Sequence, residues 1–131
     1  MTETAITDML ERGLLREADA ASLDGCLRGD RLQVLFFAGA HSQRGDNQDV
    51  AVALREILKD YGGVLEAALL RAVDDQDLLA RFRVLALPSL VLTRDGQTLE
   101  VIPRVRDWSD YAGAFRRYLG APGQEVMESR L

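Results

Sequence analysis

The segment that decides the fold runs from residue 84 to residue 97 and reads Val84-Leu85-Ala86-Leu87-Pro88-Ser89-Leu90-Val91-Leu92-Thr93-Arg94-Asp95-Gly96-Gln97. Pro88 ends any preceding helix, and the apolar residues after it are typical of a buried strand. Asp95-Gly96, between two apolar runs, is the strongest short signal for a β-hairpin. The returning strand, Thr98 to Ile102, alternates and ends at Pro103, which suits a strand end or a sheet edge. The segment therefore predicts a hairpin with a proline at its head.

A strand–helix–strand unit is predicted upstream of this hairpin. The apolar run Val34 to Ala38 is typical of a strand buried on both faces, and the polar stretch from Gly39 to Gln48 is expected to be a loop. Apolar residues then recur with helical spacing from Val50 to Tyr61, and Gly62-Gly63 ends that helix. A second strand is expected at Val64 to Leu70. Two strands joined in this way should be parallel, with a right-handed crossover.

The remaining elements are shorter. We expect a helix that begins near Ile6 and stops at Gly13, a strand near Leu14–Arg16, a helix near Ala20–Leu27 and a helix over Leu78 to Phe82. A last amphipathic helix carries Trp108 in phase with Tyr111 and Phe115, which favours a place for Trp108 in the core. We expect a single domain over residues 1–120 and a flexible tail over residues 121–131.

Three of the predicted helices share a pair of aspartates at their start. The pairs are Asp46 and Asp49, Asp74 and Asp77, and Asp107 and Asp110. The first aspartate of each pair can cap an exposed amide, and the second lies where the helix dipole favours a negative charge. Helix capping accounts for most of the acidic clusters, including Asp74-Asp75, without a partner.

Composition excludes several classes of function. The chain has 131 residues, 47% of them hydrophobic, and a net charge of −5, which argues against non-specific nucleic-acid binding. No run of 18 apolar residues exists, so no membrane insertion is expected. The N-terminus lacks the basic start and apolar stretch of a secretory signal, and we expect a cytoplasmic protein.

The chain holds one cysteine, Cys26, and one histidine, His41. An intramolecular disulfide is impossible, and a structural zinc site, which needs four ligands, is not expected. A Cys–His nucleophilic pair is formally possible, but a buried inert cysteine in a short helix is favoured for Cys26. No nucleophile–base pair, carboxylate dyad or metal set can be assembled, so we predict neither an enzyme nor a metal or cofactor.

The order of elements resembles the thioredoxin fold over roughly residues 30 to 120. Phe36-Phe37-Ala38-Gly39 resembles the strand end that leads into a thioredoxin active site, and Leu87-Pro88-Ser89-Leu90 resembles the segment with the cis-proline. The resemblance implies an α/β protein, a thioredoxin-like three-layer α/β/α fold with a central mixed sheet, and a cis bond between Leu87 and Pro88. Where a thioredoxin has Cys-x-x-Cys, this chain has Ala40-His41-Ser42-Gln43-Arg44. Thiol–disulfide exchange needs a thiolate and a resolving thiol, and neither is present there.

A narrower resemblance is to the HyaE/HupG/HoxO-type accessory proteins of nickel–iron hydrogenase maturation, which are thioredoxin-like and lack Cys-x-x-Cys. The residues that carry it include Pro88-Ser89-Leu90-Val91, Ile102-Pro103 and, most specifically, Arg106-Asp107-Trp108-Ser109-Asp110-Tyr111. The resemblance implies a chaperone that holds the precursor of the hydrogenase small subunit, with its twin-arginine export signal, until cofactors are assembled. Other hydrogenase accessory proteins are further implied partners. The alternative is a redox-inactive thioredoxin-like adaptor or structural subunit of another complex.

Two groups of residues are candidates for partner binding. Gly39, Ala40, His41, Leu87 and Pro88 would form a backbone edge that pairs with an extended peptide, as the equivalent edge does in redox relatives; the alternative is a turn that only builds the fold. Carboxylates suit bidentate binding of paired arginines, and the candidates for that contact are Asp46, Asp49, Asp74, Asp75 and Asp77.

Overall fold

The structure is a computed structural model, and it describes residues 4–27 and 29–122. The predicted tail from residue 123 onward lies outside the described residues. Helices and strands follow one another as α1 (Thr4–Glu11), β1 (Arg16–Ala18), α2 (Ala20–Cys26), β2 (Leu32–Phe37), the 3-10 turn η1 (His41–Gln43), α3 (Arg44–Asp60), β3 (Leu65–Leu70), α4 (Gln76–Arg81), β4 (Ser89–Arg94), β5 (Gln97–Pro103) and α5 (Trp108–Leu119).

The strands form one mixed sheet of five strands in the described chain, in the order β1-β3-β2-β4-β5. β1, β3 and β2 run parallel, β4 is antiparallel to β2, and β5 is antiparallel to β4. The predicted parallel pair on either side of α3 is confirmed, with Phe37 opposite Leu70. The predicted hairpin is confirmed too, because β4 and β5 meet at Asp95-Gly96.

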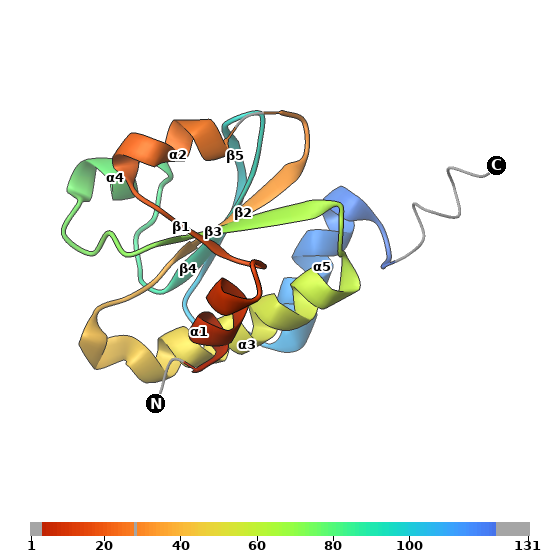
Figure 1. Cartoon of the computed structure of the whole chain (residues 1–131), viewed down its shortest axis with the longest axis horizontal. Helices are drawn as coiled ribbons and strands as arrows, with labels where there is room; N and C mark the ends of the chain where they lie inside the picture. The colour runs from red at the N-terminus through yellow and green to blue at the C-terminus, as the bar shows by residue number, and fades with distance from the viewer. Residues whose placement is uncertain (1–3, 28, 123–131) are drawn as a thin grey trace.

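Helices cover both faces of this sheet (Figure 1). α1, α3 and α5 lie on one face, and α2 and α4 lie on the other. Neighbouring residues of β2 alternate between the two layers: Phe36 packs with the first group of helices and Phe37 with the second, and both are fully buried. This is the three-layer thioredoxin-like α/β/α fold with a central mixed sheet, as predicted.

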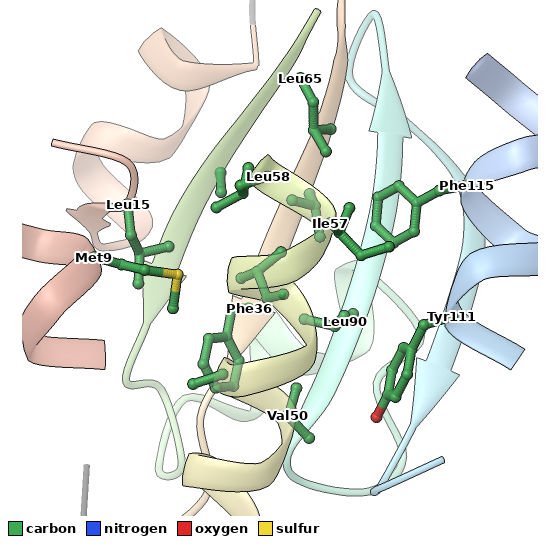
Figure 2. Packing of buried hydrophobic residues seen from close by; sticks show 14 of the residues in the cluster. Met9, Leu15, Phe36, Val50, Ile57, Leu58, Leu65, Leu90, Tyr111 and Phe115 are labelled. Atoms are coloured by element: carbon green, nitrogen blue, oxygen red, sulfur yellow. The ribbon is translucent and has the colours of Figure 1, made fainter. Parts of the chain in front are cut away.

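The larger core cluster fixes α3 and α5 against the sheet (Figure 2). Val50 and Ile57 of α3, Leu90 of β4 and Phe115 of α5 are each at most 1% exposed. Full burial of such a side chain stabilises the fold by about 1.5–3 kcal/mol. The segments that leave the strands at the end near Pro88 are therefore anchored to a rigid layer.

The first strand lies two residues later than predicted. Leu15 is buried, but the Leu14 and Leu15 amides both donate to the carbonyl of Met9, at 2.9 and 3.3 Å. These residues close the C-terminal end of α1, so β1 begins only at Arg16. The predicted helix over Ala20–Leu27 is confirmed as α2.

The predicted loop from Gly39 to Gln48 was wrong. η1 begins at His41 and α3 at Arg44, so Asp46 lies in the first turn of α3 and does not cap it.

In α4 the cap is Asp75, whose carboxylate accepts from the Leu78 amide, and it is not Asp74. Asp107 occupies the cap position of α5 without a side-chain hydrogen bond to the helix. The first turns of α3 and α4 are polar and show no apolar period, so the sequence does not mark where these two helices begin.

Trp108 does not join the core. Tyr111 and Phe115 are buried as predicted, but Trp108 is 47% exposed. It is the first residue of α5, and no element of the described chain covers the helix at that end closely enough to bury the indole.

Candidate functional site

One edge of the sheet collects both predicted groups of site residues. β2 and β3 are parallel and end side by side at Phe37 and Leu70, and β4 begins at Ser89, opposite Phe37. The segments that follow β2 and β3 and the segment that precedes β4 therefore leave the sheet at the same edge. We call this end of the sheet the carboxyl edge, because the carboxyl ends of β1, β2 and β3 lie there; the term does not refer to an outer strand.

Asn47 holds the start of the loop after β2. Its Oδ1 accepts from the Gly39 amide at 2.8 Å, and its Nδ2 donates to the Gly39 carbonyl at 3.1 Å. Asn47 has no exposed surface, so both backbone groups of Gly39 are satisfied without water. The first turns of α3 thereby fix the position of the loop.

Gln43 joins the loop to the segment before β4. Its Oε1 accepts from the Ala40 amide at 3.0 Å, and its Nε2 donates to the Leu87 carbonyl at 2.8 Å. The carboxamide passes so close to Gly39 that a Cβ at that position would collide with the Gln43 Oε1. A side chain at position 39 would therefore displace the Gln43 carboxamide, so glycine permits this close approach, and the φ angle of Gly39 is not the reason for glycine there.

The peptide bond between Leu87 and Pro88 is cis, as predicted. The Pro88 carbonyl accepts from the Arg104 amide at 2.7 Å, which ties the segment to the connection between β5 and α5. That connection is held in turn by the Tyr111 hydroxyl, which accepts from the Arg106 amide at 3.0 Å and donates to the Arg104 carbonyl at 3.2 Å. Burial raises the pKa of Tyr111 above its ordinary value, although the hydrogen bond from Arg106 acts in the opposite direction.

His41 is the exposed first residue of η1, and its carbonyl accepts from Arg44 Nη1 at 3.2 Å. Cys26 is half-buried at the end of α2, beside Arg16 and Gln33, near the starts of β1 and β2. The cysteine and the histidine therefore lie at opposite edges of the sheet. They form no Cys–His pair, and the loop has no thiol.

The acidic candidates divide between the two helical layers. Asp46 and Asp49 are exposed on α3, whereas Asp74, Asp75 and Asp77 lie around the start of α4 on the other face of the sheet. The second group lines an open hollow of about 620 Å³ that also includes Asp19 and Arg71. All five residues lie near the carboxyl edge, but the structure does not join them into one cluster. Among the described residues, no group of three or more His, Cys, Asp or Glu side chains could hold a metal ion.

Gln43 and Asn47 are the residues at this site that the sequence analysis missed. Both lie in the polar stretch whose pattern predicts a loop, and their partners are backbone groups 44 and 8 residues away. Polarity alone does not separate such an amide from an exposed one.

The fold and the site together define a class of protein: a thioredoxin-like domain in which backbone and amide contacts occupy the place of the redox cysteines. Residues 5–111 match the family described as Hydrogenase-1 expression protein HyaE, and the chain belongs to that family. The chain is 35% identical over 133 residues to the hydrogenase expression/formation protein HupG of Rhizobium leguminosarum bv. viciae, covering 98% of this chain and 89% of the relative. It is 36% identical over 128 residues to the hydrogenase expression/formation protein HoxO of Cupriavidus necator, covering 92% and 79%. The HupG protein of Bradyrhizobium diazoefficiens is 33% identical over 117 residues, covering 86% and 79%.

The family resemblance inferred from the sequence is thus confirmed. No helix within the described residues is both long and apolar enough to cross a membrane.

Proposed function

We propose that this chain is a non-catalytic chaperone of nickel–iron hydrogenase maturation. It binds the precursor of the hydrogenase small subunit, including the twin-arginine signal, in the cytoplasm before export, and other hydrogenase accessory proteins are further partners. The observation that carries the proposal is membership of a family whose relatives are named hydrogenase expression/formation proteins. The loop from Ala40 to Arg44 supports holding over turnover, because Gln43 fixes it by hydrogen bonds to Ala40 and Leu87 and it contains no thiol.

Charge supports a contact between the signal and the carboxyl edge. Asp74 and Asp77 are exposed at the hollow beside α4, and neither has an ion-pair partner within residues 4–27 and 29–122. Asp75 already caps α4, so it contributes less to a partner. Guanidinium groups bind carboxylates through two parallel, charge-assisted hydrogen bonds, which suits a segment with paired arginines.

The test is a calorimetric titration of this protein with the small-subunit precursor and with a precursor whose paired arginines are changed to glutamine. We expect weaker binding of the second precursor and a fall in affinity with added salt, because exposed charge pairs are screened over ~8–10 Å. Equal affinities would remove the signal from the proposal. Absence of binding to both precursors would overturn the chaperone assignment.

Matched charge variants locate the contact. The double variants Asp74→Asn/Asp77→Asn and Asp46→Asn/Asp49→Asn each remove two negative charges at the carboxyl edge, on opposite helical layers. The control, Asp30→Asn/Asp60→Asn, removes two exposed charges at the other edge. We expect the first variant to weaken binding most and the control to leave it unchanged. An equal effect of all three variants would show that only net charge matters.

A further inference from the structure

The segment before β4 has its carbonyl groups already occupied. The Ala86 carbonyl accepts from the Ser89 hydroxyl, the Leu87 carbonyl from Gln43 and the Pro88 carbonyl from the Arg104 amide. Proline has no N–H to donate. Within the described residues, the Leu87 N–H donates to no acceptor of the protein. The Leu87 N–H is thus a backbone donor available to a partner, as is the Ala86 N–H, and at Leu87 the donor lies beside a carbonyl that is already occupied.

A peptide that adds to a strand edge pairs through both groups of the same residue. It accepts from the residue's N–H and donates to its carbonyl. At Leu87 the first half of this pairing is available and the second half is filled by the Gln43 carboxamide, 2.8 Å from the carbonyl. Gln43 therefore makes the hydrogen bond that an incoming strand would make.

Contacts with neighbouring residues hold the Gln43 side chain in this position. Its other end is held by the Ala40 amide, and it lies over Gly39, where any larger residue would collide with it. Gly39 is fixed in turn by the buried Asn47. The side chain is half-buried, so it can swing toward solvent without unpacking the core.

We propose that Gly39, Gln43 and Leu87 form a latch that closes the peptide-binding edge, and that an extended segment of the partner opens it by displacing the Gln43 carboxamide from the Leu87 carbonyl. The inference rests on the proposed function for the identity of the partner. To that function the inference adds the backbone of Leu87 as the site of contact, and Gln43 as the residue that competes with the partner for this site. Affinity is then the intrinsic affinity of the open edge multiplied by the fraction of molecules that are open.

Removing the latch should tighten binding. Gln43→Ala frees the Leu87 carbonyl, and we expect it to raise affinity for the full-length small-subunit precursor about fivefold, the equivalent of one net hydrogen bond of ~1 kcal/mol. Gly39→Ala forces the carboxamide away and should act in the same direction. Gln97→Ala, an exposed glutamine at the start of β5 and the other edge of the sheet, is the matched control and should change nothing. A residue with only a structural role would give the opposite sign, because binding and stability would fall together.

Hydrogen exchange of the Leu87 amide gives a second, direct readout. In the free protein this amide should exchange quickly, and in the complex it should become protected as it donates to the bound strand. Suppose that the precursor binds wild type but binds Gln43→Ala no more tightly, or that the Leu87 amide stays unprotected in the complex. Either outcome overturns the latch and leaves the chaperone proposal standing. Binding to Gln43→Ala alone supports the latch. Absence of binding to wild type and to Gln43→Ala overturns both proposals.

Discussion

Asn47 satisfies both backbone groups of Gly39 from inside the protein, so its loss leaves a buried donor and a buried acceptor without partners. We expect Asn47→Ala to lower the free energy of unfolding by about 2–3 kcal/mol, because each unsatisfied buried group costs about 1–3 kcal/mol and water recovers part of the loss. Chemical denaturation measures the change. Glu56→Ala, at an exposed position of the same helix, is the control and should stay within about 0.5 kcal/mol. A loss no larger than that of the control would show that the contact does not matter for stability.

Tyr111 links stability to pH. Tyr111→Phe removes the partner of the Arg106 amide and of the Arg104 carbonyl, and we expect a loss of about 1–2 kcal/mol at pH 7. Because burial raises the pKa of Tyr111 in the folded state, ionisation favours the unfolded chain. Its contribution is complete below the ordinary value of about 10 and is lost as pH rises from there through the folded pKa.

Denaturation at several pH values tests both parts of this prediction. The fall in unfolding free energy above about pH 10 should be shallower in Tyr111→Phe than in wild type. Tyr118→Phe is the control, since its hydroxyl donates to the Leu99 carbonyl at the longer distance of 3.3 Å, and it should cost less at pH 7. The same pH slope in wild type and Tyr111→Phe would contradict the assignment.

At the level of single residues, a role could be predicted from the sequence where the covalent structure of the residue decides that role. Pro88 and the glycine at Gly96 could be placed because proline and glycine restrict or permit backbone conformations wherever they occur. Gln43 and Asn47 could not be placed, because an amide has no preferred partner until the fold brings a backbone group to it. The site was therefore predictable as a place in the chain but not as a set of contacts.

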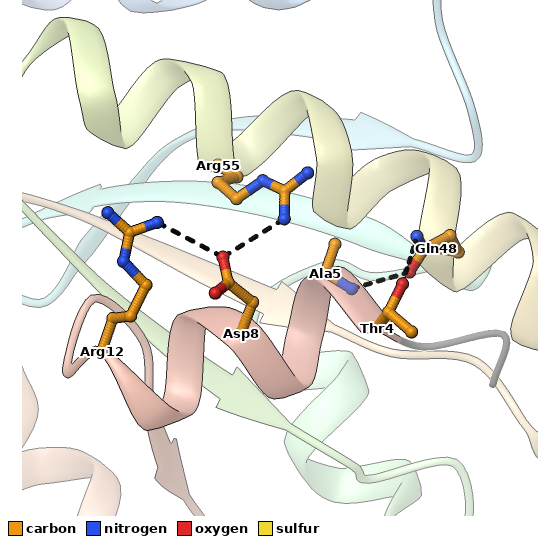
Figure 3. Close-up of polar contacts among 6 residues, drawn as sticks. All are labelled: Thr4, Ala5, Asp8, Arg12, Gln48 and Arg55. Atoms are coloured by element: carbon orange, nitrogen blue, oxygen red, sulfur yellow. Dashed lines mark hydrogen bonds and ion pairs between the residues drawn. The ribbon is translucent and has the colours of Figure 1, made fainter.

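At the scale of elements, the N-terminal helix depends on a residue of α3 (Figure 3). Gln48 Oε1 accepts from the Ala5 amide at 3.0 Å, and its Nε2 donates to Thr4 Oγ1 at 3.1 Å. The first turn of α1 is thus capped from 43 residues away. Asp8 adds ion pairs with Arg12 and Arg55, at 3.4 and 3.2 Å.

We expect Gln48→Ala to destabilise the protein by about 1 kcal/mol, the usual cost of a lost helix cap, and to speed hydrogen exchange in α1. Gln48→Glu keeps an acceptor for the Ala5 amide and should cost less, since a carboxylate is also favoured at a helix N-terminus. Asp8→Ala should cost at most about 1 kcal/mol, because ion pairs near the surface contribute little. Equal exchange rates in α1 for wild type and Gln48→Ala would argue against the cap.

Elements with a strong apolar pattern were predicted from the sequence, whereas the bounds of β1, which tertiary contacts fix, were not. α5 and the central part of α3 follow from the spacing of their apolar residues, and β2 follows from its continuous apolar run. β1 has only three residues, none of them strongly apolar, so its register is set by pairing with β3. Trp108 falls in phase with the buried residues of α5 and is nevertheless exposed, because the spacing of apolar residues does not show where the sheet beneath a helix ends.

At the scale of the whole molecule, the fold separates its one thiol from the loop that corresponds to a redox site. α2 begins after β1 at the carboxyl edge and runs back across the sheet, which carries Cys26 to the opposite edge. His41 stays at the carboxyl edge with Gln43 and Leu87. The frame of a thioredoxin is present, while the positions that would carry its chemistry hold backbone and amide contacts.

We therefore expect no disulfide reductase activity. Exchange needs a thiolate to attack the substrate and a second thiol to resolve the mixed disulfide, and a chain with one cysteine can do the first step at most. The measurement is insulin reduction in the presence of dithiothreitol, with thioredoxin as the positive control and Cys26→Ala as the matched variant. Wild type and Cys26→Ala should both give the rate of dithiothreitol alone. A faster rate in wild type that disappears in Cys26→Ala would falsify the prediction, and it would mean that the half-buried thiol at the end of α2 reaches a substrate although it lies across the sheet from the loop.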